Sequence, residues 1–170
     1  MRIRRSAAML ILAALLIAAP VAGANGEGSA IGGGWFLYAG TVPMQFGFGA
    51  VTHPDGSVDG SFHHFYVNDG FTYDFWGTLT CMSFDAVNHR AWIGGVLTKL
   101  TSTDPAPGVS VGDDAWFRVL DSPDGDRSTP MGFANDLFQT SQEYCDGMPW
   151  PEGNARTHPV TSGQIKVDAP

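Results

Sequence analysis

The chain has 170 residues, of which 44% are hydrophobic, and a formal net charge of −8 at pH 7. This length suits one domain with a sizeable hydrophobic core and argues against a second domain. The acidic balance repels nucleic acid and anionic membrane surfaces, so neither is expected as a partner.

Residues 1–24 are the first predicted element, a secretory signal peptide. The cationic start Met1-Arg-Ile-Arg-Arg precedes a short apolar run from Ala7 to Ala19 and the small-residue cleavage signature Ala22-Gly23-Ala24. The run is too short to predict a membrane span, so no membrane insertion is expected. We therefore expect a secreted, extracellular protein cleaved near Ala24, with residues 25–170 as its single domain.

Charged residues in the remainder of the chain predict turns rather than helices. Residues 1–24 hold three of the nine basic residues and none of the seventeen acidic ones. Residues 25–170 therefore contain six basic and seventeen acidic residues, a formal charge of −11. Fourteen of the acids are Asp and three are Glu, and Lys occurs only at Lys99 and Lys166. Asp favours turns, whereas Glu and Lys favour helix surfaces, so this imbalance argues against helices.

Residues 33–99 predict a meander of up to five antiparallel strands. Alternate residues from Phe71 to Cys81 and from Met44 to Ala50 are mostly apolar, the two-residue period of a half-buried strand. Turn signals separate the strands, and they are Pro54-Asp55-Gly56, Asn68-Asp69-Gly70 and Asn88-His89. Two further strands of this part are expected at Ser57–Val67 and Arg90–Lys99.

Later segments complete an all-β prediction. Asp114–Asp121, Met131–Phe138 and a closing Gly163–Asp168 are strand candidates, while Ser141–Thr157 is expected to be irregular. About eight strands and no helix favour a single antiparallel up-and-down β-barrel, with a two-sheet β-sandwich as the alternative. The barrel is preferred because short hairpins produce it and closure removes exposed strand edges.

Two cysteines, Cys81 and Cys145, remain in the predicted exported chain. Pairing is the expectation in an oxidising compartment, so we predict a Cys81–Cys145 disulfide. A reactive thiol is the alternative, but nothing in the sequence around Cys81 supplies the electropositive setting that it needs.

Three segments together resemble a family of small exported bacterial proteins of uncharacterised function, namely Cys81-Met-Ser-Phe, Asn88-His-Arg-Ala-Trp-Ile-Gly-Gly-Val96 and Phe117-Arg-Val-Leu-Asp121. The resemblance covers about residues 33–168, with its motifs in 77–121. Asn and Arg are adjacent in that family, whereas His89 separates them here. The resemblance implies a β-rich fold and no particular activity.

Gly33-Gly34-Trp35 resembles the Gly-x-Trp motif near the first strand of lipocalins, which are secreted eight-stranded barrels. The similarity to lipocalins is confined to this motif. A barrel with similar physics and separate ancestry is the preferred interpretation.

Aromatic residues on alternate strand positions predict an interior that could hold a small apolar ligand. Its candidate lining residues are Phe46, Phe48, Phe62, His64, Tyr73 and Phe75. The alternative is that these side chains simply fill a narrow eight-stranded barrel.

Asp121, Asp124 and Asp126 surround a Gly in a predicted loop and are candidate Ca²⁺ ligands. The alternative is that these Asp residues build turns. No other cofactor is expected.

These observations favour a non-catalytic binding or structural protein. One alternative is a small barrel isomerase, cyclase or hydrolase that uses His64 or an Asp in the barrel mouth. Another is an extracellular interaction module that presents Trp76 and Trp92 to a partner.

Overall fold

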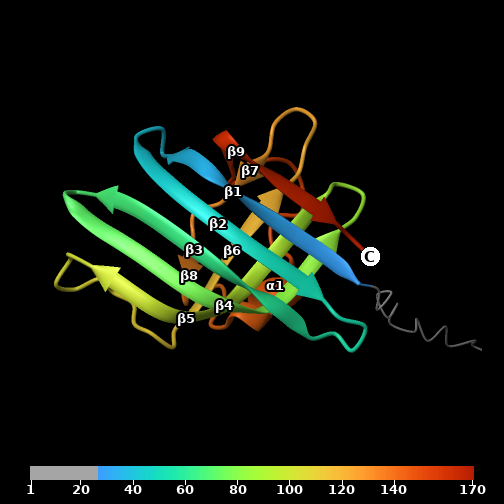
Figure 1. The fold of residues 1–170 in the computed structure, drawn as a ribbon, viewed down its shortest axis with the longest axis horizontal. Coiled ribbons are helices and arrows are strands. Elements are labelled where there is room, and N and C mark those ends of the chain that lie inside the picture. Colours follow the sequence, from blue (N-terminus) through green and yellow to red (C-terminus); the bar gives the residue numbers. More distant parts are fainter. Residues whose placement is uncertain (1–26) are drawn as a thin grey trace, which may run out of the picture.

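The computed structural model describes residues 27–170, and the predicted signal peptide lies outside them. Its strands run in Figure 1 as a tilted sheet that curls back on itself. The strands are β1 (Gly28–Tyr38), β2 (Val42–Thr52), β3 (Val58–Asn68), β4 (Phe71–Asp85), β5 (Arg90–Ser102), β6 (Asp114–Leu120), β7 (Arg127–Ser128), β8 (Gly132–Phe133) and β9 (His158–Asp168). Helix α1 (Ser141–Gly147) lies between β8 and β9.

Eight of these strands close an antiparallel barrel, which confirms the predicted fold class. Strands β1 to β5 pair in chain order, β5 pairs with β6, and β7 joins β6 to β9, which pairs with β1. The additional strand, β8, pairs with β6. The link through β7 is short, because this strand consists of two residues, Arg127 and Ser128, which pair with Pro159 and His158 of β9.

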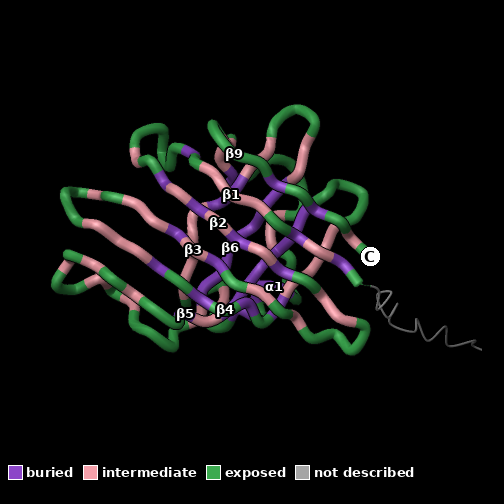
Figure 2. Tube along the Cα trace, viewed as in Figure 1, coloured by how far each residue is buried: buried purple, intermediate pink, exposed green. Residues whose placement is uncertain are grey.

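Inward-facing side chains from all around the barrel form one apolar core. Buried positions lie along the middle of the strands, and the turns are mostly exposed (Figure 2). The predicted hairpin at Asp69-Gly70 joins β3 to β4. Its φ angles of 51° and 82° are both positive, as a two-residue type I′ turn requires.

The predicted apolar face of β4 continues only as far as Leu79. Leu79 pairs with Gly95 and Cys81 pairs with Gly94, so Thr80 is an extra residue in β4, a β-bulge. One extra residue exchanges the two faces of a strand. Cys81 therefore faces outward to α1, where it forms a disulfide with Cys145.

The prediction of an irregular segment without a helix was wrong at α1. The Thr140 hydroxyl accepts a hydrogen bond from the Glu143 backbone N–H at 3.1 Å, and the Glu143 carboxylate accepts one from the Thr140 N–H at 3.3 Å. This capping box stabilises the first turn of the helix. Gly94 lets α1 approach the barrel, since a Cβ there would lie 2.7 Å from both Cys81 Sγ and Ser141 Cβ.

Helix α1 and residues 148–157 are here called the cover. The helix packs on the outer face of β4, β5 and β6, and residues 148–157 contact Trp92 of β5 and Arg118 of β6. Trp92, Trp116 and Tyr144 form a second core beneath the cover. Trp92 is fully buried, and its indole N–H donates to the Pro149 carbonyl at 2.9 Å. The expectation that Trp92 offers an exposed contact surface was therefore wrong, because the cover lies over its face of the strand.

Replacing both cysteines, as Cys81→Ser with Cys145→Ser, is expected to lower the free energy of unfolding by about 4 kcal/mol. The disulfide joins residues 64 positions apart, so its loss frees a long loop in the unfolded chain. Urea unfolding followed by tryptophan fluorescence measures the loss. An unchanged midpoint in the double variant would contradict the prediction.

Candidate functional site

Five of the six predicted ligand-lining residues meet in the barrel core: Phe46, Phe48, Phe62, His64 and Phe75. The Phe117 ring of β6 lies 5.3 Å from that of Phe48, 6.1 Å from that of Phe62 and 5.1 Å from that of His64, measured between ring centroids. These rings pack against one another, and they line neither of the two cavities described below.

Tyr73, the sixth, is half-buried. Its ring stacks on Tyr66 at 4.8 Å, and its hydroxyl donates to Asp104 at 2.6 Å. This hydrogen bond raises the pKa of Tyr73 to about 12. Tyr73 is therefore a neutral hydrogen-bond donor at physiological pH.

His64 is neutral in the core. Burial, with a smaller contribution from nearby His63, lowers its pKa to about 3. Its Nε2 has no hydrogen-bond partner among residues 27–170. The barrel core thus contains the uncharged imidazole of His64, whose Nε2 atom makes no hydrogen bond with the described residues.

The predicted calcium ligands Asp121 and Asp126 hold strand β9. One carboxylate oxygen of Asp126 accepts from the Ile165 N–H at 2.6 Å, and one of Asp121 accepts from the Val167 N–H at 3.2 Å. Asp124 is exposed. Across the described residues, no group of three or more His, Cys, Asp or Glu side chains is arranged to hold a metal ion. Calcium binding stays a prediction.

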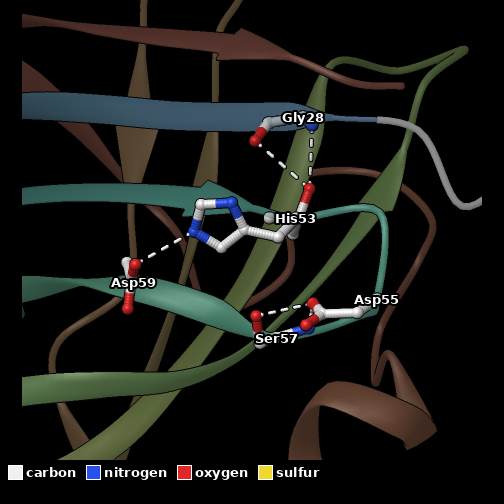
Figure 3. Close-up of polar contacts among 6 residues, drawn as sticks. Gly28, His53, Asp55, Ser57 and Asp59 are labelled. Atoms are coloured by element: carbon white, nitrogen blue, oxygen red, sulfur yellow. Dashed lines mark hydrogen bonds and ion pairs between the residues drawn. The ribbon is translucent and has the colours of Figure 1, made fainter.

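The turn between β2 and β3 contains a polar network of its own (Figure 3). The Asp55 carboxylate accepts from both the backbone N–H and the hydroxyl of Ser57, at 2.9 and 2.7 Å, and these bonds lower the pKa of Asp55. His53 Nε2 lies 3.0 Å from the Asp59 carboxylate. These contacts fasten the hairpin.

Trp76, the other tryptophan predicted to be exposed, does lie on the outer face of the barrel, 42% exposed. Its ring stacks on His63 at 4.0 Å, and the Lys99 ammonium lies 5.8 Å from the ring centroid. His63 Nε2 in turn lies 2.7 Å from the Asp74 carboxylate. Trp76 is thus exposed and held in place.

A cavity of about 360 Å³ opens between the barrel and the cover, and we call it the aromatic cavity. Its walls include Tyr38, Trp116, Tyr144, Trp150, Arg156 and His158. The Trp116 and Tyr144 rings are stacked at 5.5 Å, and the Arg156 guanidinium lies 4.1 Å from the Trp150 ring centroid. Met131 and Leu137 add apolar surface, and Asn135 adds an amide.

The polar groups that line the aromatic cavity are suited to bind an uncharged or anionic ligand. Burial raises the pKa of Tyr144, which keeps its hydroxyl protonated. Burial, and then the nearby Arg127 guanidinium, lower the pKa of His158, so its imidazole is neutral at physiological pH. Arg156 is therefore the cation among the lining residues, and no acidic side chain lines the cavity.

A second cavity, also of about 360 Å³, lies between the β4–β5 turn and the β6–β7 loop, and we call it the arginine cavity. Arg90 and Arg127 line it together with Asn88, His89, Ser122 and Asn154. His89, the residue that separates Asn88 from Arg90, has a φ of 49°. This left-handed backbone is one that Asn, Asp and His adopt more readily than most residues.

All four arginines of the described residues lie around the cover: Arg90, Arg118, Arg127 and Arg156. Within residues 27–170, none of the four forms an ion pair with a carboxylate. In a chain with seventeen acidic residues, the four arginines thus gather near the cover without a direct ion pair to a carboxylate, although Asp121 and Asp124 also line the arginine cavity.

Comparisons of the chain with family models, with curated proteins and with solved structures find no match. The two resemblances noted in the sequence therefore stay predictions. Within the described residues, no helix is both long and apolar enough to cross a membrane.

Neither cavity is predicted by the sequence pattern, because each combines loop residues that are far apart in the chain with residues of the cover, Tyr144, Trp150 and Arg156 in one and Asn154 in the other. One signal was available in the spacing of Thr140 and Glu143, which predicts a helix start. The convergence of Arg90, Arg118 and Arg127 depends on β5, β6 and β7 being neighbours, which local sequence does not reveal.

Stability is expected to fall as the pH is lowered from about 6.5 to about 3. The unfolded chain protonates His64 near its ordinary pKa of 6.5, whereas the folded chain does so near 3, so acid favours unfolding across this window. In His64→Leu this contribution to the pH dependence should vanish. Urea unfolding across the window measures it, with His53→Gln as the control, and equal pH profiles for wild type and His64→Leu would refute it.

Asp126→Ala is expected to lower the free energy of unfolding by about 1–3 kcal/mol, because the Ile165 N–H loses its acceptor. Asp124→Ala, at an exposed position, should change it by less than about 0.5 kcal/mol. Thermal unfolding with Ca²⁺ and with a chelator tests the metal prediction in the same series. A Ca²⁺-dependent rise in Tm that Asp124→Ala removes would support calcium binding, and equal curves would argue against it.

Proposed function

We propose that this protein is a secreted, non-catalytic binding protein whose ligand is a small planar, largely apolar molecule with an acidic group. The aromatic cavity, rather than the barrel interior, receives it. The observation that carries the proposal is an arginine set among aromatic rings in a cavity with no acidic side chain in its lining. The Cys81–Cys145 disulfide is consistent with an extracellular location.

The lining chemistry supports this ligand class. Trp116, Tyr144 and Trp150 offer ring faces and edges on which a planar molecule stacks favourably. Arg156 would pair with a carboxylate or sulfonate, and its stacking on Trp150 orients the guanidinium. The protonated Tyr144 hydroxyl is a further donor. Cavities of this size, mostly apolar with a few polar groups, are typical of small-molecule sites.

Binding is favoured over catalysis by the side chains that surround the aromatic cavity. His158 contacts Phe36 and Tyr38 through its ring, at centroid distances of 5.7 and 5.5 Å. Among the described residues that line the cavity, no Ser, Thr or Cys is hydrogen-bonded to this histidine, and Thr129 instead accepts from the Arg118 N–H. Nucleophilic catalysis depends on such a nucleophile–base pair.

Leu137→Trp tests the proposal, because Leu137 lines the aromatic cavity yet is 63% exposed, so a larger side chain can fill the cavity without entering the core. The probe is anilinonaphthalene sulfonate, which combines fused rings with a sulfonate. Wild type should bind it saturably, and Leu137→Trp should weaken binding at least about tenfold. Val111→Trp, at an exposed position outside the cavity, should bind as wild type does.

Native and denaturing mass spectra of protein purified from culture medium provide the second measurement. Excess native mass that is absent under denaturing conditions and in Leu137→Trp would support a natural ligand in the aromatic cavity. Equal probe affinity in wild type and Leu137→Trp would overturn the proposal. The denatured mass also reports where the signal peptide is cleaved.

A further inference from the structure

We infer that the arginine cavity is a binding site for a small oxyanion, with Arg90 as its main ligand and Arg127 beside it. The chemical class is a phosphate, a sulfate or the carboxylate of a small organic acid. The inference goes beyond the proposed function, because the arginine cavity and the aromatic cavity share no lining residue.

Arg90 is the residue that the fold leaves unsatisfied. Its side chain belongs to a residue only 7% exposed, and its Nε and Nη1 atoms are fully buried without a hydrogen-bond partner among residues 27–170. A buried guanidinium without a partner is strongly destabilising, and native structures rarely leave one so. An anion bound in the cavity would supply a compensating negative charge beside this guanidinium.

The neighbouring Arg118 and Arg127, by contrast, form hydrogen bonds with the cover. Arg118 donates to the backbone carbonyls of Pro149, Trp150 and Ala155. Arg127 donates through Nε to the Thr157 hydroxyl and through Nη2 to the Thr157 carbonyl, both at 2.9 Å. The cover therefore supplies acceptors to both of these guanidinium groups and none to Arg90.

The acids near Arg90 form their hydrogen bonds with other groups, although Asp85, which lies opposite Arg90 in the β4–β5 ladder, also interacts with it electrostatically. Asp85 accepts from the Asn88 backbone N–H at 3.1 Å and from its side-chain amide at 2.6 Å. Two acids, Asp121 and Asp124, line the cavity. Asp121 accepts from the Val167 N–H, and Asp124 is exposed. Within the described residues none of the three forms an ion pair with Arg90. Their field weakens anion binding and makes it sensitive to salt.

The cavity offers further donors to an oxyanion. Asn154, Ser122 and His89 line it, and a guanidinium can bind two oxygens of one carboxylate or phosphate at once. A volume of about 360 Å³ accommodates such a group together with water or a short organic chain.

Titration of the whole folded protein with sodium phosphate, sodium sulfate and sodium acetate, each against sodium chloride at equal ionic strength, tests the inference. Arg90→Gln and Lys99→Gln remove the same charge, but Lys99 lies over Trp76 and outside the cavity. The readouts are thermal unfolding and the NMR signals of the arginine Nε–H groups. The acetate arm distinguishes a carboxylate site from one that prefers tetrahedral anions.

At least one oxyanion should raise the Tm of wild type beyond the effect of chloride and shift the Arg90 Nε–H signal saturably. Arg90→Gln should bind it at least about tenfold more weakly, while Lys99→Gln should match wild type. Arg90→Lys keeps the charge but loses the planar fork, so it should bind at an intermediate level.

No saturable effect beyond chloride in wild type would overturn the inference, and so would equal affinities in Arg90→Gln and Lys99→Gln. If Arg90→Gln does not fold, the wild-type spectra decide. Shifts centred on Arg90 and Arg127 support the site, and shifts confined to other residues refute it. Leu137→Trp should bind the anion as wild type does, which separates this result from the proposed function.

Discussion

The contacts of Arg118 with residues 149–155 are the interaction on which the position of the irregular part of the cover depends. Its guanidinium is buried on the outer face of β6 and donates to carbonyls at both ends of the 149–155 segment. Burial lowers the pKa of Arg118, yet the guanidinium stays charged because its ordinary value is far above physiological pH. Together with the disulfide to α1, Arg118 holds residues 149–155 against the barrel. This irregular part of the cover contributes Trp150 to the aromatic cavity and Asn154 to the arginine cavity.

Most elements of the barrel could be predicted from the sequence, whereas the helix of the cover was not predicted. Alternation along β2 and β4 predicts strands, and Asp69-Gly70 predicts its hairpin, because these signals are local. The two-residue period also places Phe46, Phe48 and Phe62 on one face, and all three lie in the barrel core. Cys81 lies on the opposite face from the one expected, because a single extra residue at Thr80 is invisible to a two-residue period.

The candidate sites could not be predicted for a different reason. Arg90 and Arg127 are 37 positions apart, and the pairing of β5 with β6 and of β6 with β7 brings them to one cavity. Trp150 and Arg156 have φ angles of 55° and 62° in a segment without regular structure, so no periodic pattern marks them. The lining of the aromatic cavity thus draws on a segment without regular structure, while the barrel provides a rigid support.

The short strand β7 gives the barrel a seam. Long ladders join β1 to β5 in chain order, β5 to β6 and β9 to β1, whereas β7 pairs with β6 and with β9 at two positions each. The carboxylates of Asp126 and Asp121 accept from the N–H groups of Ile165 and Val167. Local opening begins where few backbone bonds must break. Hydrogen exchange of the amides that join β7 to β9 will therefore be faster than exchange within the long ladders of β1 to β5.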